Sequence, residues 1–238
     1  MASKIKIYEV GGSLRDEILG YKVKDRDYCV LADSYSEMRD FILFLGGKIY
    51  LEREEFFAIR CKIPNIGDAD FTLARKEGFY SDGRHPDSVQ PAATIEEELS
   101  RRDFTVNAMA REVGSSDIID PFGGQISCHL KQLDCVGNEH DRFSEDSLRL
   151  LRAIRFSITK NLKIGRGVYL SLTNQKLVSL LKNISKERIR EEVAKCFEFD
   201  TLKSFHTFYD FPLVLAEVLN TGLWFKPTLE QRNVKNKH

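Results

Sequence analysis

The stretch Gly11-Gly12-Ser13-Leu14-Arg15-Asp16 decides the fold. A β-rich run over Ile5–Val10 precedes it, and a helical pattern over Ser13–Leu19 follows it. Paired glycines between a strand and a helix let the backbone approach an anion, and free N–H groups at a helix start favour phosphate. Arg15, one turn into the helix, predicts a guanidinium contact to phosphate oxygens. A plain Gly-Gly turn is the alternative, and this motif alone does not exclude it.

Carboxylates gather in the same part of the chain. Asp25-Arg26-Asp27 precedes the predicted strand Tyr28–Ala32, and alternate residues of an extended chain face the same side. Two carboxylates at one point suit Mg²⁺. Asp70, on the predicted strand Asp68–Ala74, adds a third group that completes the metal site or takes a proton from a hydroxyl. The alternatives are a polar turn before a strand and an ordinary exposed strand end.

The remaining pattern divides the chain into a mixed and a helical part. Strands are predicted at Ile5–Val10, Tyr28–Ala32, Lys48–Leu51, Phe56–Lys62 and Asp68–Ala74, with helices at Ser13–Leu19 and Tyr35–Leu45. Gly78–Pro91 is predicted to be a surface loop. Helices follow at Ile95–Ser100, Phe104–Arg111, Ser144–Thr159, Thr173–Leu181, Lys186–Phe199 and Thr201–Leu223, the last broken at Phe211-Pro212. We therefore expect an α+β fold, a mixed sheet with helices followed by an all-helical region.

Composition narrows the class of protein. Hydrophobic residues make up 42% and charged residues 30% of the 238 residues, the ordinary range for a soluble globular protein. No apolar run reaches the roughly 20 residues that span a bilayer, and Met1–Lys6 lacks the apolar core of a secretion signal. We expect a cytoplasmic protein without a membrane partner. Five scattered cysteines without a Cys-x-x-Cys pair predict buried thiols, rather than a disulfide framework or a zinc site.

The net charge of zero hides an asymmetry. Residues 139–238 carry 18 Lys and Arg against 12 Asp and Glu, a net charge of +6, so residues 1–138 carry −6. An acidic part that holds metals beside a basic part that meets phosphates fits a polymerase.

Five motifs in order resemble those of the class II tRNA nucleotidyltransferases. These CCA-adding enzymes share their head with bacterial poly(A) polymerases, in the DNA polymerase β superfamily. The matching segments are Gly11–Asp16 with Lys24–Asp27, Arg101–Met109, Asp120–Gly124, Glu145–Phe156 and Ser185–Glu192. The resemblance covers about residues 5 to 195 and implies a polymerase-β-type head at 1–137, a base-recognising neck at 138–200, and a short helical body remnant with a polar tail at 201–238.

The resemblance also assigns roles to side chains. Arg102 matches a nucleotide-contacting arginine, and Asp103 and Asn107, four apart in a predicted helix, match residues that recognise ribose. A helix cap is the alternative for Asp103. In the helix predicted over Ser144–Thr159, a carboxylate and guanidiniums recur at three- and four-residue intervals, at Asp146, Arg149, Arg152 and Arg155.

An Asp and an Arg can bind the Watson–Crick edges of cytosine and adenine. The resemblance implies that these side chains serve as the template, so that no nucleic-acid template is needed. A salt-bridged surface helix is the alternative. The ion-pair-rich segment Glu187–Glu192 is expected to brace the neck.

The implied reaction adds CCA to the 3′ end of tRNA from CTP and ATP. Two Mg²⁺ ions are expected, with Asp25 and Asp27 as ligands and Asp70 assisting. Gly11, Gly12 and Arg15 would hold the triphosphate. Poly(A), CC or A addition are the related alternatives. A nucleotide-binding regulatory module is an alternative from another class, and a metal-dependent phosphohydrolase is disfavoured because the five histidines show no metal-ligand spacing.

Two segments bear on the choice among these activities. Tyr80–Asp87 resembles the flexible loop of enzymes that add C, which favours CCA addition. Only some 40 residues follow the last neck motif, so we expect a grip on tRNA that is reduced, supplied by a second subunit, or absent, and we leave the oligomeric state open. Near the C-terminus, Phe208, Tyr209 and Trp224 offer aromatic rings for RNA stacking, although packing of a C-terminal helix is the stronger interpretation.

Overall fold

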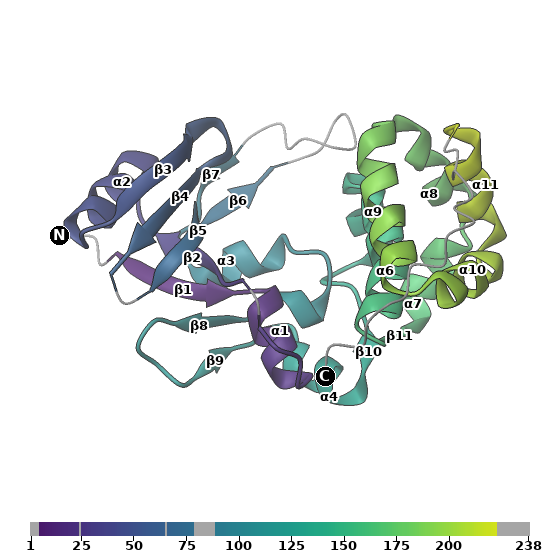
Figure 1. Cartoon of the computed structure of the whole chain (residues 1–238), viewed down its shortest axis with the longest axis horizontal. Helices are drawn as coiled ribbons and strands as arrows, with labels where there is room; N and C mark the ends of the chain where they lie inside the picture. The colour runs from purple at the N-terminus through teal and green to yellow at the C-terminus, as the bar shows by residue number, and fades with distance from the viewer. Residues whose placement is uncertain (1–4, 24, 65, 79–88, 223–238) are drawn as a thin grey trace.

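The computed structural model describes residues 5–23, 25–64, 66–78 and 89–222. A seven-stranded mixed sheet forms one part of the molecule, in the order β3-β4-β5-β2-β1-β8-β9 (Figure 1). Its strands are β1 Lys6–Val10, β2 Asp27–Leu31, β3 Lys48–Arg53, β4 Ala58–Ile63, β5 Gly67–Leu73, β8 Ala110–Glu112 and β9 Ile118–Ile119. The β2–β5 pair is parallel and the others are antiparallel. This arrangement places Asp27 directly opposite Asp70 in the ladder.

Helices cover both faces of the sheet. On one face, α2 (Tyr35–Phe44) buries Met38 and Ile42 against the strands, and the Ser34 side chain caps its first turn. On the other face, α3 (Ile95–Ser100) buries Ile95 and Leu99. The short helix α1 (Gly12–Ile18) follows β1 directly. Because successive side chains of a strand point to opposite faces of the sheet, the strands contribute to two separate hydrophobic clusters.

The second part of the molecule is almost entirely helical (Figure 1). Its helices are α5 Glu139–Glu145, α6 Leu148–Thr159, α7 Arg166–Leu172, α8 Gln175–Ser179, α9 Lys186–Phe199, α10 Thr201–Asp210 and α11 Pro212–Asn220. Before it, α4 (Gly124–Leu130) leads into β10 (Gln132–Leu133), which pairs in parallel with β11 (Lys163–Ile164). The mixed sheet with helices confirms the α+β prediction.

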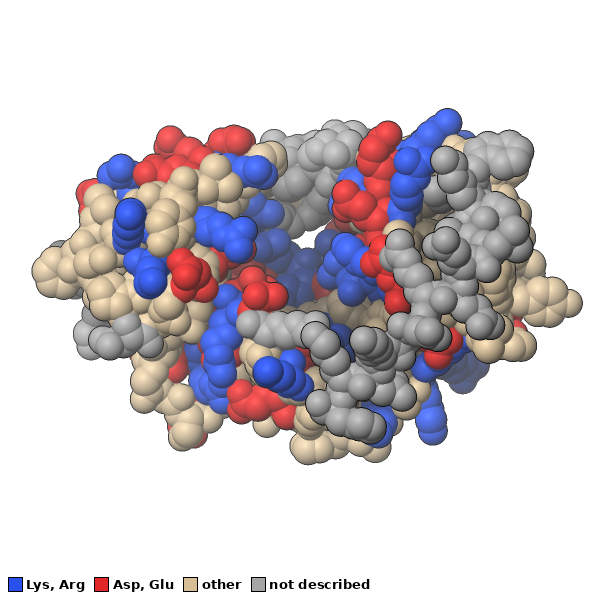
Figure 2. Space-filling model, viewed as in Figure 1, with Lys and Arg blue, Asp and Glu red and all other residues tan. Residues whose placement is uncertain are grey.

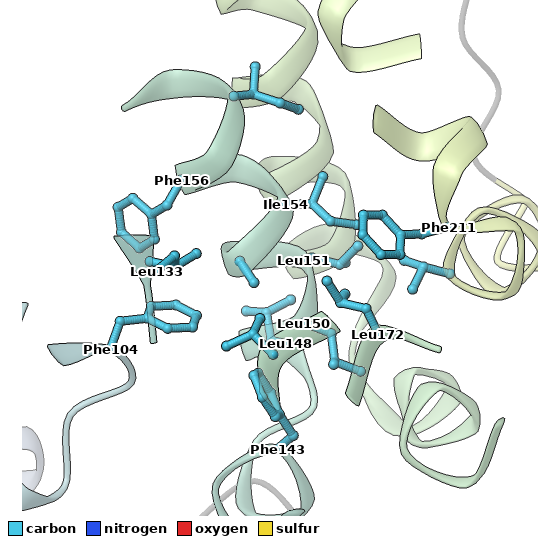
Figure 3. Close-up of a cluster of buried hydrophobic side chains, with 14 of the residues drawn as sticks. Phe104, Leu133, Phe143, Leu148, Leu150, Leu151, Ile154, Phe156, Leu172 and Phe211 are labelled. Carbon is cyan, nitrogen blue, oxygen red and sulfur yellow. The ribbon is translucent and has the colours of Figure 1, made fainter. Parts of the chain in front are cut away.

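A hydrophobic cluster joins the two parts. Phe156 of α6 packs edge-on against Phe104, at 5.8 Å between ring centroids, and Phe143 of α5 lies on the other side of Phe104 at 6.5 Å (Figure 3). Leu14 of α1 belongs to the same cluster. Because buried apolar contacts cross position 138, the head and neck are packed together, and the domain boundaries remain a prediction.

The helix predicted over Phe104–Arg111 is wrong. The chain instead forms a 3₁₀ turn at Thr105–Asn107 and then the strand β8, which pairs with β1. Ala108, Met109 and Ala110 are fully buried there. Sheet pairing and burial therefore override the helical spacing of the segment.

The helix predicted over Ser144–Thr159 begins later, as α6 at Leu148, and its first two predicted residues are instead the end of α5. Asp146 separates the two helices with extended backbone angles, φ −145° and ψ 99°, and its Oδ1 accepts a hydrogen bond from the Leu148 amide at 3.0 Å. A short Asp side chain that bonds a nearby amide competes with helix continuation.

The remaining predictions concern helix bounds, the loop after β5 and the cysteines. α3 and α9 have the predicted bounds, and Phe211-Pro212 separates α10 from α11 as expected. Within the predicted loop Gly78–Pro91, β7 (Val89–Pro91) pairs with β6 (Arg75–Glu77), while residues 79–88 lie outside the described part. The helices α4 and α7 were not predicted. All five cysteines are buried free thiols, as expected.

No described helix has the length and apolarity to cross a membrane.

Candidate functional site

A cavity of about 460 Å³ lies between the sheet and α6. Ten of the thirteen predicted site residues line it, and they come from α1, β2, β5, the segment after α3, the α5–α6 junction and α6: Gly12, Arg15, Asp27, Asp70, Arg102, Asp103, Asn107, Asp146, Arg149 and Arg152. Figure 2 shows basic side chains on both sides of the hollow between the two parts. The walls combine five arginines with four aspartates, since Arg101 also lines the cavity.

The Gly-Gly turn leaves room for a guanidinium. Gly11 has φ +74°, which favours glycine, and a Cβ there would lie 2.5 Å from Arg102 Nη1. Gly12, which starts α1, lines the cavity, whereas Gly11 is not among the lining residues. The missing side chain therefore allows Arg102 to lie against the turn.

Arg15 is held inside the protein, which the sequence did not predict. Its Nη1 donates to Asn107 Oδ1 at 2.6 Å, and its guanidinium pairs with Asp16 at 2.8 Å. Its Cζ lies 4.9 Å from the centroid of the Phe156 ring. Only 6% of the residue is exposed, so Arg15 forms part of the cavity floor with most of its donors engaged.

The carboxylates of β2 and β5 are far less constrained. Asp27 and Asp70 are exposed, and Asp70 has a loose pair with Arg60 at 3.6 Å. Loss of water at the cavity wall raises the pKa of Asp27; the Arg102 charge opposes this shift, and the charges of Asp70 and Asp25 add to it. Asp70 and Asp25 are therefore close enough to Asp27 for their charges to disfavour its ionised form.

The donor chemistry of this edge fits a divalent cation. Hard carboxylate oxygens on adjacent strands suit Mg²⁺, and a cation between them would relieve their repulsion. Asp25, however, is not among the cavity-lining residues. The strand begins only at Asp27, so alternation along an extended chain does not apply to Asp25. Within the described residues, no three His, Cys, Asp or Glu side chains form a ready-made metal site.

Asp103 and Asn107 meet in the cavity, although not through a helix. Asn107 Nδ2 donates to Asp103 Oδ1 at 2.9 Å, and Arg152 pairs with Asp103 Oδ2 at 2.6 Å. Burial alone would raise the pKa of Asp103, but the Arg152 charge and hydrogen bonds from Asn107, Arg152 and the Phe104 amide lower it to about 2. The pair is thus a preassembled polar surface rather than two free groups.

Arg149 and Asp146 also have internal partners. Arg149 Nη1 donates to Glu145 at 2.8 Å and to the Arg142 carbonyl at 2.7 Å. Arg188 of α9 lies 3.4 Å from Asp146 Oδ2. The bonds hold both side chains at the cavity, even though Asp146 lies between the helices and not on α6.

Arg155 is the exception on α6. Its Nε donates to the buried Glu192 of α9 at 2.6 Å, and it is absent from the cavity lining. Three residues along a helix turn a side chain by roughly 300°, so Arg155 is directed to α9 while Arg152 reaches the cavity. The Glu192 contact provides the ion pair expected to brace the neck.

The sequence missed four lining residues: Val10, Thr72, Arg101 and Phe156. Arg101 stood inside a matched motif without a role. Phe156 follows Arg155 at the end of another matched segment, and three guanidiniums lie within 6 Å of its ring centroid, from Arg15, Arg152 and Arg155. An aromatic ring four residues after Arg152 was an available signal for a cation–π support.

The remaining predicted features are the loop Tyr80–Asp87 and the aromatic residues near the C-terminus. Tyr80–Asp87 and Trp224 fall outside the described residues. Phe208 is buried, with 3% exposed, whereas Tyr209 is 79% exposed, so this pair forms no common stacking surface. Burial of Phe208 agrees with helix packing.

Comparison with known families gives a consistent picture. The family model described as "Poly A polymerase head domain" matches residues 7–133. The CCA-adding enzyme of Streptococcus mutans serotype c is 35% identical over 201 residues, which are 84% of this chain and 46% of that enzyme. The CCA-adding enzyme of Listeria innocua serovar 6a is 33% identical over 82% of this chain and 48% of its own length. The chain thus spans about half the length of the curated relatives it matches.

Solved structures show the same likeness. The Bacillus stearothermophilus CCA-adding enzyme in complex with CTP has a TM-score of 0.75 and 26% identity, over 88% of this chain and 49% of that one. A tRNA nucleotidyltransferase complexed with a primer tRNA and an incoming ATP analog has a TM-score of 0.73 and 30% identity, over 93% and 61%.

Proposed function

The chain belongs to the poly A polymerase head domain family, and from this premise we propose that it adds CCA to the 3′ end of tRNA, using CTP and ATP. The observation that carries the proposal is the cavity, where carboxylates on one wall face guanidiniums on the other. CCA-adding enzymes are the curated relatives at 33–35% identity, and neighbouring structures were solved with CTP and with tRNA. Each of these features supports nucleotide transfer to RNA.

Asp27 and Asp70 would hold the metal at the sheet edge. Bound there, Mg²⁺ would neutralise phosphate charge and activate the RNA 3′-hydroxyl for in-line attack on the α-phosphate. Gly12 and Arg102 would bind the triphosphate, since the guanidinium lies against the open turn. Pyrophosphate would leave from that side of the cavity. The assignment of Asp25 as a further ligand rests on the sequence motif.

The opposite wall would recognise the nucleoside. Asp103 and Asn107 offer oxygen and amide groups for ribose hydroxyls, and Arg152 keeps the carboxylate ionised. Asp146 and Arg149 combine an acceptor and donors for the edges of cytosine and adenine. Internal hydrogen bonds hold these groups in place before a nucleotide arrives, which lowers the entropy cost of recognition.

Primer extension tests the proposal. Purified protein with Mg²⁺ would be incubated with tRNA transcripts that end before CCA, after C and after CC, with CTP, ATP or both. The expected products stop after three, two and one added nucleotides, and Asp27→Asn should abolish them. Asp68→Asn is the matched control, because Asp68 is an exposed aspartate on the neighbouring strand β5 and is absent from the cavity lining.

Other product patterns identify other activities. A long A tract indicates a poly(A) polymerase, and addition of CC or of one A indicates a partial enzyme. Nucleotide binding without extension of any transcript would contradict the proposal and favour a nucleotide-binding regulatory module.

A further inference from the structure

Glu98 is a buried carboxylate at the back of the cavity. It lies on the buried face of α3, beside Leu99, and its side chain is 0% exposed. Its oxygens accept hydrogen bonds from the Arg75 amide at 3.0 Å and from Arg101 Nε and Nη2 at 2.8 and 2.6 Å. Arg102 Nη2 donates at 3.3 Å. Carboxylates are almost never fully buried unless they are paired, and here one group binds two guanidiniums.

Both of these guanidiniums line the cavity. Arg102 is held at two points, since Nη2 bonds Glu98 and Nη1 bonds the Asn107 carbonyl at 3.3 Å. The same Nη1 lies against the turn at Gly11. Two attachment points define the plane of a guanidinium, whereas a single ion pair leaves it free to turn. Glu98 therefore determines which donors of Arg102 face the cavity.

The position of Arg102 also affects Asp27. The positive charge of Arg102 acts on Asp27, the carboxylate at the start of β2 that lines the same cavity. Without Glu98, Asp27 would be an alternative partner for Arg102, and closure of that pair would remove both groups from a ligand. A buried anion behind Arg102 holds the guanidinium away from this contact.

We infer that Glu98 is a positioning residue, which holds Arg101 and Arg102 at the cavity wall as a preformed receptor for a triphosphate. The inference rests on the proposed function, in that the cavity takes a nucleoside triphosphate. Glu98 itself does not line the cavity, so it acts through the two arginines. Because the contact is to phosphate, its effect is the same for CTP and ATP.

The chain offers a matched control in Glu192. This carboxylate is also buried, with 5% of the residue exposed, and it pairs with Arg155 at 2.6 Å and Lys195 at 3.5 Å. Neither of its partners lines the cavity. Glu98→Gln and Glu192→Gln therefore remove the same charge from similar surroundings, and they differ in whether the released arginine faces the cavity.

Calorimetric titration without RNA measures the effect. The ligands are CTP, ATP and inorganic triphosphate, each with Mg²⁺. Glu98→Gln should raise all three dissociation constants by about tenfold or more, whereas Glu192→Gln should change them by less than about twofold. In extension assays of the active protein, Glu98→Gln should raise KM for CTP and ATP by the same factor and change kcat less.

Two results would overturn the inference: unchanged triphosphate affinity in a folded Glu98→Gln protein, or an equal loss in Glu192→Gln. Thermal unfolding of each variant shows whether it is folded. If Glu98→Gln does not fold, Arg101→Lys keeps the positive charge and loses the forked contact, and it should still weaken triphosphate binding severalfold; unchanged binding in that variant rejects the inference. Failure of RNA extension with intact triphosphate binding would reject the proposed function and leave this inference standing.

Discussion

The two walls of the cavity hold their charges in opposite ways. The carboxylate wall, Asp27 and Asp70, is exposed, and within the described part of the chain its one ion pair is the loose contact of Asp70 with Arg60. The arginine wall, Arg149 and Arg152 with Asp103, is mostly buried, and each of its side chains has short hydrogen bonds to protein groups. Both walls are charged, but only the arginine wall has its charged groups hydrogen-bonded to other groups of the protein.

Because of this difference, we expect the arginine wall to contribute to the stability of the fold and the carboxylate wall to contribute to catalysis. Groups of the arginine wall stabilise the fold, because a buried ion that loses its partner is costly. On the carboxylate wall, loss of water raises the pKa of Asp27, the Arg102 charge opposes this shift and the charges of Asp70 and Asp25 add to it, so a bound cation would favour the ionised groups. We expect substitutions on the two walls to affect different measurements, and the following predictions are ordered from the largest effect to the smallest.

Asp27→Asn should give the largest loss of activity. Without the carboxylate, nucleotide addition to RNA should fall roughly a thousandfold, equivalent to about 4 kcal/mol of transition-state stabilisation. The melting temperature should stay the same or rise, since an acid with a raised pKa destabilises the fold at neutral pH. Extension assays and thermal unfolding test the two halves. A marked loss of stability would show that the walls do not differ as described.

Arg152→Met should mainly reduce stability. It leaves the buried Asp103 carboxylate with Asn107 and the Phe104 amide as its remaining partners, at a cost of about 3 kcal/mol. Urea unfolding measures this change. Arg166→Met is the control, because Arg166 is exposed on α7 and should cost less than about 0.5 kcal/mol. Equal effects of the two substitutions would contradict the structural role of Arg152.

Asp103 should make stability fall in acid. Its folded pKa of about 2 is below the ordinary value of 3.8, so its ionised form contributes roughly 2 kcal/mol above pH 4. The contribution disappears as the pH falls from about 4 to about 2. Asp103→Asn should therefore reduce the free energy of unfolding at pH 6 and have a smaller effect at pH 3. A pH-independent difference would assign the effect to packing instead.

Arg60→Ala should have the smallest effect on stability. Arg60 and Asp70 are 63% and 54% exposed, and such surface pairs contribute about 0 to 1 kcal/mol. Thermal unfolding should show almost no change. A loss above about 1 kcal/mol would mean that the carboxylate wall depends on this pair for its structure.

Sequence patterns predicted elements where local signals agreed. The bounds of α3 and α9 follow from a hydrophobic face over a complete helix, and Thr94 caps α3 as such sequences do. The segment after Phe104 shows the opposite case: its spacing is helical, but pairing with β1 and burial of Met109 place it in the sheet. Pairing with a distant strand leaves no local mark, so the sequence could not show it.

The same limit applies to the site. Motif order identified the residues of both walls, because metal binding and base recognition need particular side chains. Whether a side chain faces the cavity depends on helix phase and on where a strand begins, and these placed Arg155 against Glu192 and left Asp25 outside the lining. Glu98 had no motif, and only its contacts with Arg101 and Arg102 give it a role.

The sequence by itself determined the family, the α+β class and the chemical identity of the two walls, because these follow from residue types and their spacing. Tertiary structure alone decided which charges are free and which are satisfied. Asp27 and Arg152 are both charged residues in matched motifs, yet one repels its neighbours at an exposed strand start and the other binds a buried carboxylate. That difference depends on burial and on partners distant in the sequence, and it exists only once the chain has folded.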